Sequence, residues 1–110
     1  MLPIDYRKLS PIGTNEFPCM GAHSMWRPKE DKPYCYALRV GIKKTDDCLD
    51  MLVKIPISDA QKKLKQDLLK HFYQTYPITV QFENLQIFKY QINSKIIYTG
   101  TADSVQILEE

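Results

Sequence analysis

The sequence predicts one mainly β domain, in which five antiparallel strands form a small barrel with a single helix between the third and fourth strands. Three observations support this. Apolar and polar residues alternate over residues 34–57 on both sides of a polar turn, which is the period of half-buried strands. An apolar stripe with helical spacing follows over residues 59–73, and the period of two resumes at Ile78. At 110 residues, the chain has the length of a single domain.

Residues 1–15 are predicted to form an irregular N-terminal arm, because prolines and a glycine interrupt them. The apolar residues of this arm are expected to pack against the barrel: Leu2, Ile4 and Leu9. The domain itself is predicted over residues 16–110. Its first strand is expected at Phe17–Trp26, with a bend or bulge at Gly21.

A charged loop at residues 27–33 leads into the central hairpin of residues 34–57. Its turn is predicted at residues 44–47, where Lys-Thr-Asp-Asp supplies polar turn chemistry. One apolar residue, Leu52, breaks the alternation of the second strand. One face of this hairpin is therefore expected in the core and the other in solvent.

The helix is predicted over residues 59–73, where Ser58 can cap its start and Gln61 can complete a capping box. A long strand then begins at Ile78 and changes its apolar phase near Asn84, which predicts a bulge there. A turn at residues 93–94 and a returning strand over 95–102 follow. Residues 103–110 are predicted as either a short edge strand through Val105 and Ile107 or a tail.

Three strands, a helix and two further strands, in this order, form the layout of the OB barrel. A β-grasp-like α+β sheet and a partly open roll are the alternative folds. Residues 16–104 also resemble the small OB-fold single-stranded-DNA-binding accessory proteins of conjugative plasmids and integrative elements of Gram-positive bacteria. The segments that carry the resemblance are LRVGIKKTDDCLDMLVKIP and ITVQFENLQIFKYQINSKIIYTGTADSV. The resemblance implies sequence-tolerant binding of a displaced DNA strand during replication or transfer of a mobile element, without catalysis.

Single-strand binding needs flat side chains on which bases stack and cations that follow the phosphates. In an OB barrel these lie on the second and third strands and on two flanking loops. The predicted nucleic-acid-binding residues are Trp26, Arg27, Lys29, Lys32, Tyr34, Tyr36, Arg39, Lys54, Phe88, Lys89, Tyr90 and Lys95. Residues 26–44 hold six basic and two acidic side chains, a local charge of +4, whereas the whole chain carries +2.

Several of these residues also have a structural interpretation. Tyr34 and Tyr36 share the phase of core residues, so they are either stacking platforms or core. Phe88 and Tyr90 follow the predicted bulge, so the alternation does not assign them to the core face or to the solvent face. Lysines in loops and on the predicted helix are common solubilising residues.

The sequence favours no catalytic or metal chemistry. Cys19, His23, Cys35 and Cys48 do not match the common zinc spacings. Acidic pairs occur only at a turn and at the end of the chain, and the four glycines are scattered. We therefore expect a non-enzymatic protein without a cofactor or a metal.

Three hypotheses of function follow. The first is binding of single-stranded DNA, with single-stranded RNA as the alternative ligand, by stacking and phosphate neutralisation. The second is a protein-interaction module that docks a replication or conjugation partner without nucleic acid. The third is a phage or plasmid structural subunit that assembles through the edge at residues 105–107. No membrane span or signal peptide is recognised, so a cytoplasmic location is expected, and a homo-oligomer is possible.

Overall fold

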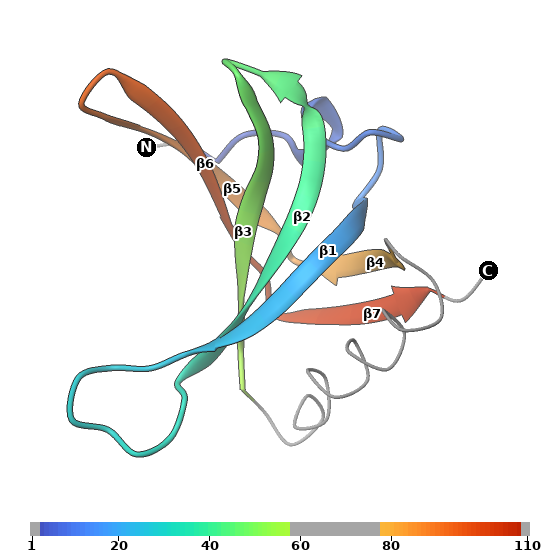
Figure 1. Cartoon of the computed structure of the whole chain (residues 1–110). Helices are drawn as coiled ribbons and strands as arrows, with labels where there is room; N and C mark the ends of the chain where they lie inside the picture. The colour runs from blue at the N-terminus through green and yellow to red at the C-terminus, as the bar shows by residue number, and fades with distance from the viewer. Residues whose placement is uncertain (1–2, 58–77, 109–110) are drawn as a thin grey trace.

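A computed structural model describes residues 3–57 and 78–108 of the chain. These residues form one seven-stranded sheet (Figure 1). The strands are β1 (Glu16–Met25), β2 (Cys35–Thr45), β3 (Cys48–Pro56), β4 (Ile78–Glu83), β5 (Gln86–Ile92), β6 (Lys95–Thr101) and β7 (Ser104–Leu108). Their order across the sheet is β5-β6-β3-β2-β1-β4-β7.

The prediction of a closed, five-stranded, antiparallel OB barrel with a helix is wrong. The sheet has seven strands, ends at β5 and β7, and is mixed, because β3 and β6 run parallel while the other pairs are antiparallel. The predicted helix at residues 59–73 lies outside the described residues. Within the described residues, the helical structure is a short 3-10 turn, η1 (Tyr6–Lys8).

The strand number differs because the predicted long strand from Ile78 divides into β4 and β5, and because residues 104–108 add β7 after β6. The long strand divides at Asn84, which has a φ of 54°, so that β4 pairs with β1 and β7 while β5 pairs with β6. Residues 102–103 separate β6 from β7. The backbone N–H of Asp103 donates to the carbonyl of Glu83 at 2.9 Å, and the side-chain amide of Asn84 donates to the Asp103 carboxylate at 2.7 Å. The predicted irregularity near Asn84 therefore separates two strands rather than forming a bulge within one, and of the two alternatives for residues 103–110 the short edge strand is confirmed as β7.

Both predicted hairpin turns are confirmed, and each has two residues with positive φ. The values are 51° and 64° at Asp46 and Asp47, and 49° and 68° at Asn93 and Ser94. Two successive residues of this kind give a turn whose twist matches that of the flanking strands, and Asn and Asp tolerate it better than most residues. Local sequence therefore fixes the β2–β3 and β5–β6 hairpins.

The first strand and the N-terminal arm also follow the prediction. The register of β1 against β2 shifts between Cys19 and Gly21, where the bulge was expected. Within the arm, the backbone N–H of Ile4 donates to the Ile87 carbonyl at 2.7 Å. Leu9 is only 2% exposed and packs in the core. The expected packing of Ile4 and Leu9 is confirmed, and Leu2 lies outside the described residues.

The core lies on the inner face of the curved sheet and takes alternate residues from most strands. Leu38, Val53 and Val80 are fully buried there, and each such side chain contributes about 1.5–3 kcal/mol relative to exposure. The rings of Phe17 and Phe82 pack with their centroids 5.9 Å apart. Successive side chains of a strand point to opposite faces of the sheet, so the residues next to these core positions project from the outer face.

Candidate nucleic-acid interface

A row of directly paired residues crosses four strands on the outer face of the sheet. Arg39 of β2 pairs with Leu52 of β3, Leu52 pairs with Thr99 of β6, and Thr99 pairs with Phe88 of β5. Residues that oppose one another on neighbouring strands project to the same side. The row therefore places a guanidinium at one end and an aromatic ring at the other.

The adjacent rows extend this surface. Lys54 pairs with Ala37 and lies two residues beyond Leu52, while Tyr90 pairs with Ile97 and lies two residues beyond Phe88. Arg39 and Lys54 are exposed, and Phe88 is half-buried. We refer to this surface as the outer sheet face, made up of Arg39, Leu52, Lys54, Phe88, Tyr90, Ile97 and Thr99.

The outer sheet face contains apolar residues that were not among the predicted site residues. These are Leu52, at 37% exposure, and Ile97, at 36%, although each lies within a strand. They lie on the same face as the predicted Tyr90, which is 43% exposed. The sequence signal for Leu52 was its break in the alternation of β3. Aliphatic side chains beside a ring enlarge the apolar surface against which a base can pack.

One acidic residue shares this face. Asp50 of β3 lies two residues before Leu52, and its carboxylate is 4.0 Å from the Arg39 guanidinium. Both side chains are about half exposed, at 52% for Arg39 and 48% for Asp50. An ion pair this open contributes little to stability, so Arg39 remains available to another anion.

Lys89 does not belong to the outer sheet face, which corrects its grouping with Phe88 and Tyr90. Its neighbours in β5 project to the opposite side, and Lys89 pairs with the buried Tyr98. Its ammonium forms an ion pair with Asp46 at 3.1 Å. The Tyr98 hydroxyl donates to the same carboxylate at 2.6 Å.

This contact joins the β2–β3 turn to the β5–β6 hairpin and shifts two pKa values. The hydrogen bond from Tyr98 and the Lys89 ammonium hold the pKa of Asp46 below its usual value. Burial, together with the Asp46 carboxylate, raises the pKa of Tyr98 to about 12. Asp46 therefore helps to hold the hairpin that carries Phe88 and Tyr90.

Tyr36 is a core residue, and its assignment as a stacking platform is wrong. It is 8% exposed and belongs to the main apolar cluster, as its shared phase with Leu38 allowed. Lys95, in contrast, is exposed at the start of β6, next to the Asn93–Ser94 turn. It therefore lies at the tip of the β5–β6 hairpin.

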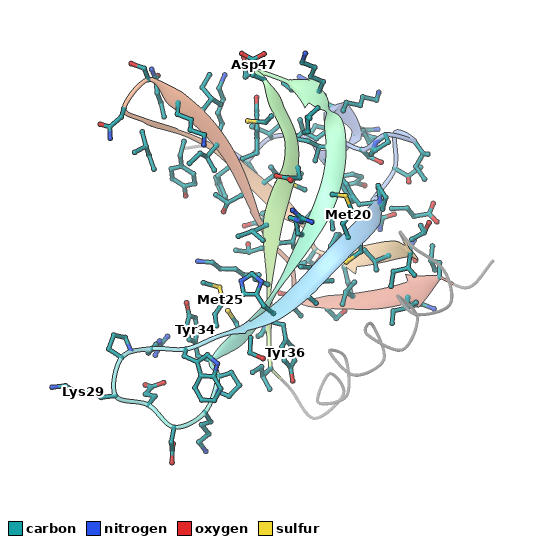
Figure 2. All side chains as sticks on the ribbon, viewed as in Figure 1. Met20, Met25, Lys29, Tyr34, Tyr36 and Asp47 are labelled. Carbon is teal, nitrogen blue, oxygen red and sulfur yellow. The ribbon has the colours of Figure 1, made fainter. Side chains whose placement is uncertain are left out.

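The loop at residues 26–34 holds the remaining predicted residues. Trp26 is 54% exposed, and the guanidinium of Arg27 lies over the half-buried Tyr34 ring, 4.7 Å from its centroid. This cation–π contact covers one face of the ring. Lys29 and Lys32 are exposed, and Figure 2 shows Lys29 at the outer end of the loop.

The loop and the β5–β6 hairpin extend beyond the body of the sheet. Figure 1 shows both projecting to the same side of the view, the loop near the lower end of β3 and the hairpin beside its upper end. β3 supplies Leu52 and Lys54 between them. The predicted cations and rings thus come from three places: the outer sheet face, the loop and the hairpin tip.

Other kinds of site find less support in the described part of the chain. Residues 3–57 and 78–108 contain no group of three or more His, Cys, Asp or Glu that could hold a metal ion. Burial raises the pKa of the Cys19 thiol to about 11, which makes it a poor nucleophile at neutral pH. No helix in these ranges has the length and apolarity needed to cross a membrane.

A hollow of about 650 Å³ lies at the corners of the divided strands and is lined by residues that include Asn15, Asn84 and Asp103. Its amides are used within the fold. Asn15 donates to the Phe82 carbonyl at 2.8 Å, and Asn84 donates to Asp103. We assign these groups to holding the strand corners rather than to a ligand.

Comparisons with protein-family models, with curated proteins and with solved structures each found no match to this chain. The resemblance drawn from the sequence therefore stays a prediction.

Proposed function

We propose that the protein binds single-stranded nucleic acid along the outer sheet face, without catalysing a reaction. The observation that carries the proposal is the paired row from Arg39 to Phe88, with Lys54 and Tyr90 in the adjacent rows. Cations on β2 and β3, with the half-buried Phe88 and the exposed Tyr90 on β5, suit a strand whose phosphates lie towards β2 and β3 and whose bases lie towards β5. Each base stacked on an aromatic side chain contributes about 1–3 kcal/mol.

The 26–34 loop and the tip of the β5–β6 hairpin extend the proposed interface at its two ends. Trp26, at 54% exposure, has a ring open for stacking, and Lys29, Lys32 and Lys95 are open to phosphates. We propose that the protein acts in this way during replication or transfer of a mobile element.

Fluorescence anisotropy with labelled oligo-dT at two salt concentrations tests the proposal. Affinity is expected to fall with salt by about 0.7 log units per log unit of salt for each neutralised phosphate. The fluorescence of Trp26, the one tryptophan of the chain, is expected to be quenched when the oligonucleotide binds. Absence of binding at low salt would refute the proposal and favour a protein partner.

A further inference from the structure

Asp50 lies where a phosphate would approach Arg39. Its cross-strand partner is Gly41, which presents no side chain, so the nearest long side chain on β2 is the diagonal neighbour Arg39. A larger residue at position 41 is disfavoured, because a Cβ there would lie 3.2 Å from the Pro18 ring. The strands therefore direct the carboxylate towards the guanidinium.

The contact between these groups is loose. The nearest oxygen of Asp50 is 4.0 Å from Arg39, and both side chains are about half exposed. A carboxylate and a phosphate present similar oxygen pairs to a guanidinium. An arriving phosphate can therefore replace the carboxylate without breaking a buried contact.

We propose that Asp50 is an internal competitor that occupies Arg39 in the free protein and is displaced by a phosphate of the bound strand. This inference rests on the proposed function and adds a regulatory element to the same site. Asp50 then lowers affinity and keeps binding readily reversible.

The test compares Asp50→Asn with Asp47→Asn in the full chain. Both changes remove one negative charge, but Asp47 lies at the tip of the β2–β3 hairpin (Figure 2), outside the outward rows. Binding of labelled oligo-dT at low salt is measured for both, with melting temperature as the check on folding. D50N is expected to bind about two- to fivefold more tightly than the wild-type protein, the range that an exposed ion pair can supply, and D47N to change less.

A second pair separates competition from general repulsion. In an Arg39→Gln background, D50N has no guanidinium to release, so its gain is expected to disappear. An equal gain with and without Arg39, or equal effects of D50N and D47N, would overturn the role of Asp50 while leaving strand binding intact. If wild-type protein and all variants fail to bind at low salt, the proposed function itself is refuted and this inference with it.

Discussion

Replacing Tyr90 with alanine separates binding from folding at the outer sheet face. The ring is 43% exposed, so about half of its surface already meets solvent. Full burial of a large apolar side chain contributes about 1.5–3 kcal/mol, and the variant should therefore lose only about 1 kcal/mol of folding free energy. Loss of one stacked base would cost about 1–3 kcal/mol of binding free energy, or about 5- to 140-fold in Kd.

The assay is anisotropy with labelled oligo-dT, beside thermal unfolding followed by circular dichroism. Tyr90→Phe keeps the ring and should bind like the wild-type protein. Gln91→Ala changes an exposed residue on the opposite side of the same strand and should also leave binding unchanged. A folded Y90A that binds normally, or a Q91A that loses as much affinity as Y90A, would refute the placement of the interface.

Two further predictions concern the fold. Gly100→Ala should lower the free energy of unfolding by about 1–3 kcal/mol, because its Cβ would lie 3.2 Å from a Val53 methyl. Gly21→Ala should change the free energy of unfolding little, because nothing lies within 4 Å of the added Cβ. Equal urea midpoints for the two variants would contradict this packing. Because the pKa of Asp46 is lowered in the folded protein, its stabilising effect is complete above the unfolded-state pKa of about 3.9 and is lost as the pH falls through the folded-state value. Asp46→Asn should therefore weaken the dependence of the free energy of unfolding on pH in the acid range, measured by urea unfolding at several pH values. Tyr98, with a pKa raised to about 12, should lose its contribution as the pH rises above about 10, and tyrosinate absorbance should show its titration moving down in the Asp46→Asn variant.

The sequence was sufficient for features that depend on neighbouring residues. The Asp46–Asp47 and Asn93–Ser94 turns require residues that tolerate positive φ, and the chain has such residues between alternating strands. The bulge near Gly21 and the break at Asn84 were likewise visible as interruptions of a local pattern. Short-range backbone preferences fix these elements, so they could be predicted.

Pairing between distant strands could not be read in the same way. The parallel contact of β3 with β6 joins residues 52–54 to residues 99–101, and no local pattern specifies such a partner. The division of the C-terminal strands also depends on contacts between corners, such as that of Asn84 with Asp103. These contacts between residues distant in sequence distinguish the open mixed sheet from a closed antiparallel barrel.

The faces on which the candidate site residues lie could be predicted only in part, for the same reason. Both phases are apolar after Asn84, so only the structure shows that Ile87 is buried while Phe88 and Tyr90 lie on the other face. Lys89 was grouped with the rings by proximity in sequence, although adjacent strand residues project to opposite sides. Tyr36 followed its phase into the core.

The salt dependence of strand binding tests the central claim most directly. In the Arg39→Gln/Lys54→Gln double variant, the slope of log Kd against log salt concentration for oligo-dT should be shallower than in the wild-type protein by about 1.4, because two phosphate contacts at ~0.7 each are removed. Lys89→Gln, whose ammonium pairs with Asp46 on the opposite side of β5, should keep the wild-type slope. An unchanged slope in the double variant would contradict the claim that a strand lies along the outer sheet face.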